Sequence, residues 1–269
     1  MKLVVLAAAC SGCLLTPDPP TCDGPYGAPV PLYEVESDQN DDSPWLSRDR
    51  LELLFASERE GSFRIYGATR ATPDGMFDPP IALTDGSHME SNPFVTSDGL
   101  TLYYSELYAA STIYRAMRSS RDVLFQPGEP VAELDTHGSL SLTDDQLDIF
   151  YDEVNSQGEQ QVSTSHRTRV TDPFPPGHPL SLGPDTYAAP AISSDGAVLL
   201  VDHYSGSGND FMRQLARSER RPDGTFGPAV DELDVPTGSF DGSTIDDDII
   251  IYASNGADAD LYTSERSCR

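Results

Sequence analysis

The chain has 269 residues, and 38% of them are hydrophobic, which is enough to bury a sizeable core. Its 44 acidic and 17 basic residues give a formal net charge of −27 at pH 7. A field of that sign repels phosphate backbones and anionic membrane surfaces, so we expect no nucleic-acid partner. Protein, carbohydrate and cationic partners remain open, and much of the acid is expected to form a solvated surface.

The N-terminal stretch MKLVVLAAACSGCLL contains one Lys, a short apolar run and small residues before a cysteine. Ala7-Ala8-Ala9-Cys10 resembles the lipobox of bacterial lipoproteins, which implies that Cys10 is lipidated. Ala7 stands where that motif usually has Leu, and Cys13 is the alternative acceptor. A plain secretory signal and a misassigned start are the other interpretations.

This interpretation makes residues 1–10 a lipoprotein-type signal segment and residues 11–24 a tether. The expected location is the cell envelope, on the periplasmic or surface side, with a lipid anchor in a bacterial membrane; the alternative is secretion. No later segment is long and apolar enough to span a bilayer. Export would place the two remaining cysteines, Cys22 and Cys268, in an oxidising compartment where paired cysteines form disulfides.

A repeat of about 50 residues runs through the chain. The stretch SNPFVTSDGLTLYYSE, residues 91–106, has counterparts at 43–57, 138–153, 188–203 and 239–254. In each copy a short strand reaches an Asp turn, and a strand of β-branched and aromatic residues follows. The turn residues are Asp49, Asp98, Asp145, Asp195 and Asp246, spaced 47 to 51 residues apart. Asp-Gly-type turns tolerate the positive φ that tight hairpins need.

Two more strands are expected in each copy. A third carries pairs such as Ile65-Tyr66, and a fourth begins with an aromatic residue and Pro, as in MFDPPIAL and PFPPGHPLSL. Pro is tolerated in an outer edge strand because its missing N–H is not needed there. Four antiparallel strands at this period predict the blade of a β-propeller, so the fold class is all-β.

The last copy lacks its fourth strand, and the segment PYGAPVPL at residues 25–32 has the matching pattern. We therefore predict a five-bladed propeller over residues 25–266, closed by the N-terminal strand joining the last blade. The blades are expected at about 43–83, 91–134, 138–182, 188–233, and 239–266 together with 25–32. Cys22 and Cys268 would then face each other where one hairpin is interrupted, and a disulfide there would close the ring. Two unpaired thiols are the alternative.

The pattern Pro-x-x-Ser-x-Asp-Gly, an apolar strand, and Ile-Tyr-x-Ala resembles the WD40-like repeats of TolB-type propellers. The match is best in NPFVTSDGLTLYYSE and PAISSDGAVLLVDH, whereas Leu140 and Asp241 stand where Pro is expected. TolB-type proteins normally have six blades and an additional N-terminal domain, so equivalence to TolB is not implied. The resemblance implies an envelope propeller of the binding type.

A candidate binding face follows from the order of strands in a blade. Residues that begin first strands and residues that end second strands lie on the same face, around the channel mouth. Those with carboxylate, imidazole or phenol groups are Asp41, Glu90, His137, Tyr187, Glu106, Asp152, Glu153, Asp202 and His203. We expect this acidic face to bind a protein or an envelope glycan, with the tether on the opposite face.

The alternative function is a glycoside hydrolase-like enzyme that uses two of these carboxylates as acid and base or nucleophile. No catalytic motif is recognisable. Trp45 is the only Trp of the chain, so few indole rings are present on which sugars could stack. No cofactor, catalytic residue or metal ligand is assigned, although carboxylates and His203 leave a structural Ca²⁺ open.

Overall fold

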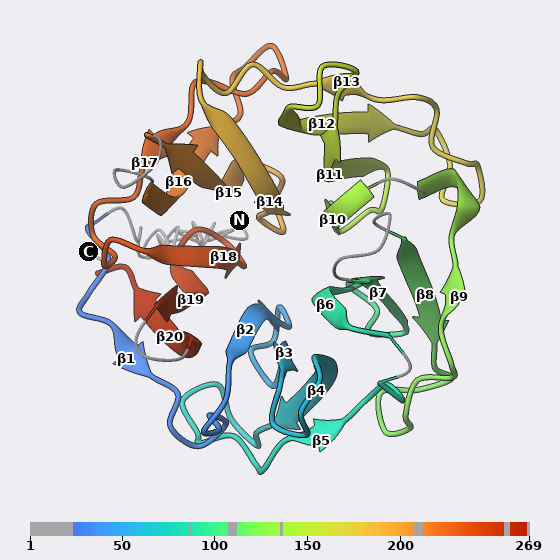
Figure 1. Cartoon of the computed structure of the whole chain (residues 1–269), viewed down its shortest axis with the longest axis vertical. Helices are drawn as coiled ribbons and strands as arrows, with labels where there is room; N and C mark the ends of the chain where they lie inside the picture. The colour runs from blue at the N-terminus through green and yellow to red at the C-terminus, as the bar shows by residue number, and fades with distance from the viewer. Residues whose placement is uncertain are drawn as a thin grey trace, which may run out of the picture.

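The computed structural model describes residues 24–86, 88–106, 112–134, 137–206, 212–255 and 259–267. Twenty strands form five four-stranded antiparallel sheets, arranged as a ring (Figure 1). The fold is the predicted five-bladed β-propeller. One short 3₁₀ turn, η1 (Ala132–Leu134), is the only helical element among the described residues.

Each of the first four blades uses four strands that are consecutive in the chain. Blade 1 contains β2 (Asp41–Leu46), β3 (Glu52–Ser57), β4 (Arg64–Thr69) and β5 (Ile81–Ala82). Blade 2 contains β6 (Glu90–Val95), β7 (Thr101–Glu106), β8 (Ile113–Met117) and β9 (Glu129–Pro130). Blade 3 contains β10 (His137–Leu142), β11 (Asp148–Val154), β12 (Gln160–His166) and β13 (His178–Pro179). Blade 4 contains β14 (Thr186–Ile192), β15 (Val198–Ser205), β16 (Met212–Glu219) and β17 (Val230–Asp231).

Blade 5 is built from both ends of the chain. It contains β18 (Ser239–Thr244), β19 (Ile249–Asn255), β20 (Ala259–Glu265) and the N-terminal β1 (Val30–Pro31). β1 pairs antiparallel with β20, with Val30 opposite Thr263 and Pro31 opposite Tyr262. Figure 1 shows β1 beside β20 at the outer edge of the ring. The predicted closure by the segment 25–32 is therefore present.

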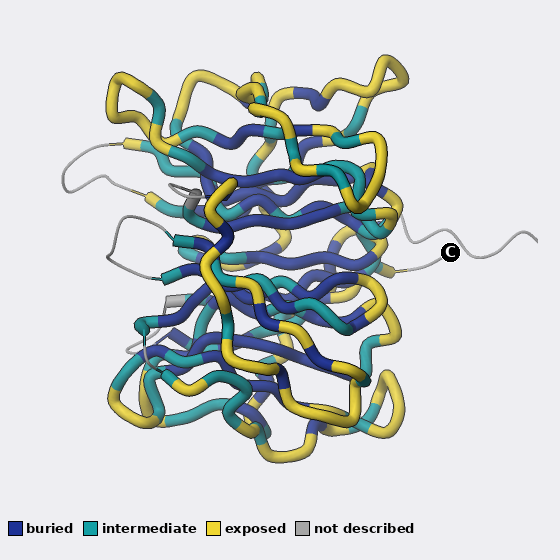
Figure 2. The backbone as a smooth tube through the Cα atoms, turned by 90° about the vertical axis from the view of Figure 1, so that its right-hand side faces the viewer, coloured by how far each residue is buried: buried dark blue, intermediate teal, exposed yellow. Residues whose placement is uncertain are grey.

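The hydrophobic core consists of five clusters, one between each pair of neighbouring blades. The second strand of a blade packs on both sides, and all six residues of β3 are buried. Figure 2 shows the buried strands running across the disc from one face to the other. Burial on both sides explains why these strands read as continuous apolar runs rather than as alternating patterns.

In four of the five blades, the Asp of the turn between first and second strands bonds within its own turn. In blade 1, Asp49 Oδ1 accepts hydrogen bonds from Ser47 Oγ at 2.7 Å and from the backbone N–H of Leu51 at 3.1 Å. The next residue, Arg50, has a φ of +60°. Asp98, Asp145 and Asp195 repeat this arrangement, with Gly99, Gln146 and Gly196 at the positive φ. The recurring Ser/Thr-x-Asp motif therefore stabilises the turn between the first and second strands.

A second repeated feature was not identified from the sequence. An Arg at the end of each third strand lies over the aromatic ring that begins the fourth strand, at 4.0 to 5.1 Å from the ring centroid. The pairs are Arg70 and Phe77, Arg118 and Phe125, Arg167 and Phe174, Arg220 and Phe226, and Arg266 and Tyr26. In the first three blades the aromatic residue follows the Arg by seven positions, a spacing visible in the sequence.

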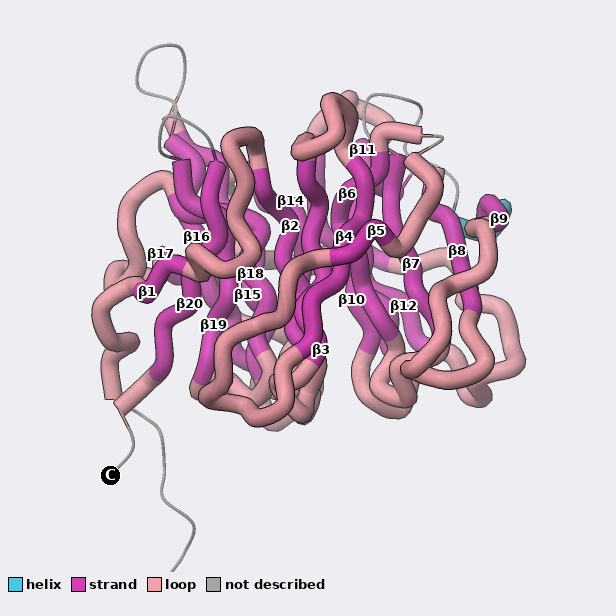
Figure 3. The backbone as a smooth tube through the Cα atoms, turned by 90° about the horizontal axis from the view of Figure 1, so that it is seen from below, coloured by secondary structure: helices cyan, strands magenta, loops and turns pink. Residues whose placement is uncertain are grey.

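The disc has two faces. The turn face carries the Asp turns and the hairpins between third and fourth strands, and the loop face is the opposite one. The described ends of the chain meet beside the turn face, where the N–H of Ser267 lies 3.4 Å from the carbonyl oxygen of Pro25 (Figure 3). Cys22 and Cys268 lie outside the described residues, so their disulfide stays a prediction.

Candidate functional site

The structure brings the predicted site residues to one face, in cross-strand pairs. Glu90 lies opposite Glu106, His137 opposite Glu153, and Tyr187 opposite His203. All of them lie at or near the loop-face ends of their strands. Although these residues share one face, many of their polar atoms already have hydrogen-bond partners within the protein and are not available to a ligand.

Asp41 and Glu90 are fully buried. Asp41 accepts hydrogen bonds from Arg59 Nη2 at 3.0 Å and from the N–H of Ser37 at 2.6 Å. Glu90 accepts a short hydrogen bond from the hydroxyl of Thr84 in the preceding blade connection. Burial raises the pKa of Glu90, and its Oε1 has no partner among the described residues. The two carboxyl groups that were expected at the channel mouth therefore lie inside the structure, where they hold loops and blades together.

Asp152 and Glu153 are engaged within their own blade. Asp152 accepts the N–H of Ser139 at 2.7 Å and Gln160 Nε2 at 2.8 Å. Glu153 accepts Ser163 Oγ at 2.6 Å. These carboxylates fix the ends of β10, β11 and β12.

Two imidazoles are held by acidic groups near the outer part of the loop face. His203 Nδ1 lies 2.6 Å from Asp231 and its Nε2 3.2 Å from Asp185, while its ring stacks on Tyr187 at 5.0 Å. His88 Nδ1 lies 3.3 Å from Glu106. Among the described residues, no group of three or more His, Cys, Asp or Glu is arranged to hold a metal ion.

The channel near the loop face contains a charged cluster around Arg213. Its guanidinium bonds Asp202 at 2.5 and 2.8 Å and Asp241 at 2.6 Å. Asp202 also accepts the N–H of Asp241 at 2.9 Å. Burial is the largest effect on Asp42 and Asp202, and it raises the pKa of each carboxyl. The Coulombic interaction with Asp241 raises both further.

Each first strand has a bulge between its loop-face end and its turn-face end. The bulge residues Ser43, Asn92 and Asp241 have φ values near +50° and line a void of about 50 Å³. Ser43 Oγ lies 2.9 Å from Ser91 Oγ and 3.2 Å from Asp241 Oδ2. We call these hydrogen-bonded bulge residues the waist. They lie between the charged cluster around Arg213 and a larger cavity toward the turn face.

The larger cavity lies on the propeller axis and opens at the turn face. We call it the axial cavity; it has a volume of about 350 Å³. Its apolar lining comes from the last residues of four first strands and from the residue that follows the fifth: Trp45, Leu46, Phe94, Val95, Leu142, Ile192 and Ile245. Trp45 and Phe94 are partly exposed and form an edge-to-face pair with centroids 6.3 Å apart. Sequence reasoning missed this site.

Polar groups surround the mouth of the axial cavity. Arg48 of the blade 1 turn forms a short ion pair with Asp144 of the blade 3 turn, across the turn of blade 2. Ser97 Oγ donates to the carbonyl oxygen of Asp144 at 2.9 Å. Burial raises the pKa of Asp144, although Arg48 opposes the shift. The 62% exposed side chain of Arg48 makes this pair a surface contact that solvent reaches.

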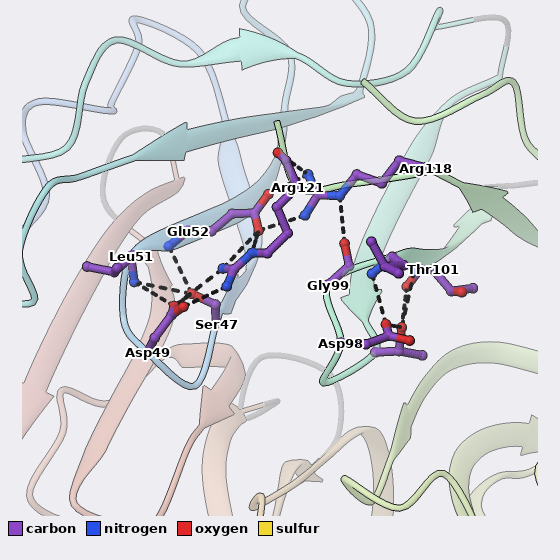
Figure 4. Close-up of polar contacts among 11 residues, drawn as sticks. Ser47, Asp49, Leu51, Glu52, Asp98, Gly99, Thr101, Arg118 and Arg121 are labelled. Carbon is purple, nitrogen blue, oxygen red and sulfur yellow. Dashed lines mark hydrogen bonds and ion pairs between the residues drawn. The ribbon is translucent and has the colours of Figure 1, made fainter. Parts of the chain in front are cut away.

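One wall of the mouth is braced by a network between blades 1 and 2 (Figure 4). Arg121 bonds Asp49 at 2.6 Å, which lowers the pKa of Asp49 to about 2, mainly through that hydrogen bond. The buried pair of Arg118 and Glu52 lies behind it at 2.8 Å. Figure 4 shows both arginines reaching from blade 2 toward the turn of blade 1. This wall of the cavity is therefore fixed by ion pairs between blades 1 and 2.

Searches with the sequence give no functional assignment: no family model matches the chain, and no curated protein is significantly similar to it. No helix among the described residues could cross a membrane.

Comparison with solved structures shows the fold. TolB from Acinetobacter baumannii superposes with a TM-score of 0.58 at 14% identity, over 87% of this chain and 56% of that protein, so this chain spans little more than half of it. The putative TolB from Agrobacterium tumefaciens gives 0.53 at 15% identity, over 86% and 77%. The catalytic domain of a Coprinopsis cinerea GH62 α-L-arabinofuranosidase gives 0.59 at 12% identity, over 91% and 97%. The chain thus has a TolB-like β-propeller fold that glycoside hydrolases share.

Proposed function

We propose that the protein is a binding module that holds an apolar or aromatic group of its partner in the axial cavity. The observation that carries this proposal is the cavity itself. Ligand sites are typically concave, several hundred Å³ in volume and mostly apolar, with a few polar groups at their edge. The axial cavity, with about 350 Å³ and the pair of Trp45 and Phe94 in its wall, has these properties.

The energetics of such binding are adequate. An aromatic group that loses about 150 Å² of apolar surface gains roughly 4 kcal/mol, before the costs of association. Ser97 and Ser194 line the mouth and could bond the polar part of the partner. The loop-face carboxylates Asp41, Glu90 and Asp202 support this choice of face, because internal partners already occupy them.

The proposed partner is a protein or a glycan of the cell envelope, and the protein itself is proposed to be exported and lipid-anchored through Cys10. The described chain starts beside the turn face, so residues 11–24 would attach there. Fourteen residues extend to at most about 45–50 Å, which would keep the axial cavity near the membrane. Intact mass of the membrane-purified protein tests this: a diacylglyceryl group on Cys10 supports it, and an unprocessed chain overturns it.

Binding in the axial cavity can be tested with the neutral fluorescent probe N-phenyl-1-naphthylamine. Trp45 is the only Trp of the chain and lines the cavity, so its emission reports on occupancy. The probe should quench Trp45 and gain emission through energy transfer. Ser97→Phe places bulk at the mouth and should abolish both changes. Ser156→Phe, an exposed substitution on the loop face, is the matched control and should leave them unchanged.

A second candidate function is glycoside hydrolysis near the waist. Asp42 has a raised pKa, and the hydroxyl of Ser43 lies 3.0 Å from Asp42 and 3.2 Å from Asp241, so two carboxyl groups in different surroundings are close together. The void there is about 50 Å³, which favours the binding function. Release of nitrophenol from aryl arabinofuranosides by the wild type, lost in Asp241→Asn, would reverse this preference.

A further inference from the structure

A second cleft lies between blades 3 and 4, outside the axial cavity. It has a volume of about 450 Å³ and is lined by strand ends of blade 3 and by the hairpin between β16 and β17. Its floor is apolar, with Phe150 and Phe226 in an edge-to-face pair at 5.5 Å. Arg220, Arg221, His166 and His178 also line it, whereas Asp148 is the only carboxylate in that lining. In a chain of net charge −27 this concentration of cationic and imidazole groups is unusual.

Arg220 departs from the repeated arrangement of the other blades. Four of the five equivalent arginines donate Nε–H to the carbonyl oxygen of the left-handed turn residue, at 2.6 to 2.9 Å. The Nε of Arg220 is buried and has no hydrogen-bond partner among the described residues. Its hairpin is one residue shorter, with Phe226 six positions after the Arg, and the guanidinium lies 5.1 Å from that ring. A buried donor without an acceptor lowers the stability of the folded state, so such a group in a native structure needs a structural or functional reason.

Two other donor groups of the cleft are also available, whereas His166 Nδ1 is paired with Asp148 at 2.8 Å. Arg220 Nη2 lies 3.8 Å from Asp148, longer than a hydrogen bond. The side chain of Arg221 is exposed and makes no ion pair in the described part of the chain. The lining of the cleft therefore has two guanidinium groups and one carboxylate, although Asp144, Asp145 and Asp195 line the adjoining pocket together with Arg220. Planar guanidinium groups bind tetrahedral oxyanions through paired hydrogen bonds.

We propose that this cleft binds a phosphate or sulfate group carried on a small organic molecule. Arg220 and Arg221 hold the oxyanion, and the apolar floor of Phe150 and Phe226 takes the organic part, for which the cleft has room beyond the anion. At about 0.15 M ionic strength the Debye length is about 8 Å, so acidic groups beyond that distance are largely screened, and only the aspartates of the adjoining pocket act on Arg220. This inference is independent of the function proposed for the axial cavity.

Calorimetric titration of the full-length protein with phenyl phosphate, inorganic phosphate and phenol tests it. Phenyl phosphate is expected to bind most tightly, inorganic phosphate more weakly, and phenol not at all. Arg221→Gln should weaken phenyl phosphate binding about tenfold. Arg115→Gln removes the same charge from an exposed site on β8 and is expected to leave the affinity unchanged.

The variants also separate the alternatives. Arg220→Gln tests the second guanidinium, and because Arg221 is exposed its replacement keeps the test valid if Arg220→Gln unfolds the hairpin. Equal weakening in Arg221→Gln and Arg115→Gln would mean a general charge effect and would overturn the assignment. Absence of phenyl phosphate binding to the wild type would overturn it as well. If inorganic phosphate bound as tightly as phenyl phosphate, the proposal that the apolar floor binds an organic group would be wrong.

Discussion

The guanidinium of Arg266 lies over the ring of Tyr26 at 4.0 Å, and it joins the two ends of the chain. The pair is the seam copy of the Arg–aromatic contact that each other blade makes within one hairpin. Arg266 Nη1 also donates to the carbonyl oxygen of Gly24 at 2.8 Å, and Tyr26 OH lies 3.1 Å from Asp247. The ring is therefore closed by side chains as well as by β1.

Replacing Tyr26 by Ala should open the seam. Tyr26 is 5% exposed, and truncation of a buried aromatic side chain costs about 3–5 kcal/mol of the free energy of unfolding. Urea unfolding followed by far-ultraviolet circular dichroism measures the loss. Tyr33→Ala, at a 77% exposed position, should change the free energy by less than about 0.5 kcal/mol. Similar losses in both variants would show that the seam contributes no specific stability.

The disulfide between Cys22 and Cys268 should stabilise the same seam. It would close a loop of nearly the whole chain, and native disulfides contribute roughly 2–5 kcal/mol. Reduction should therefore lower the urea midpoint of the wild type but not that of the Cys22→Ser, Cys268→Ser double variant. Alkylation of both thiols before any reductant is added would disprove the bond.

The stability of the protein should depend on pH through Asp42. Burial raises the pKa of Asp42 to about 8, above the value of about 4 expected in the unfolded chain. The folded state then keeps its proton while the unfolded state loses it, so the free energy of unfolding should fall as pH rises from about 4 to about 8. Asp42→Asn should remove about 1–3 kcal/mol of this fall.

Urea midpoints measured across this pH range check the prediction for Asp42. Asp38→Asn, at an exposed position, is the control and should follow the wild type. A slope that is unchanged in Asp42→Asn would assign the pH dependence to other groups.

The ion pair of Arg48 and Asp144 should act as a weak barrier at the mouth of the axial cavity. Exposed pairs contribute about 0.2–1 kcal/mol, so Arg48→Ala should leave the melting temperature almost unchanged. The same energy corresponds to an association rate for N-phenyl-1-naphthylamine that is up to about fivefold higher. Stopped-flow fluorescence measures the rate. A slower association in Arg48→Ala would mean that Arg48 recruits the probe instead.

The sequence allowed the fold to be predicted because its signals are local and repeated. Asp98 bonds its own turn, and the Pro-rich fourth strand of each blade follows directly in the chain. The seam could be predicted because the missing strand has a recognisable copy at residues 25–32.

The site was less predictable because its properties depend on neighbouring blades. Glu90 begins a first strand, as expected, but the hydroxyl that binds it belongs to Thr84 and the N–H to Ile65. The axial cavity is formed where five first strands converge, and no single copy of the repeat carries its signature. The spacing from Arg118 to Phe125 is visible in the sequence, but only the structure shows that the two side chains are in contact and that other blades repeat the contact.

The most direct test of the binding proposal is to soak crystals of the protein with N-phenyl-1-naphthylamine and determine the structure. We expect electron density for the probe in the axial cavity, against the rings of Trp45 and Phe94. Density for the probe only elsewhere, with the axial cavity filled by ordered water, would contradict it.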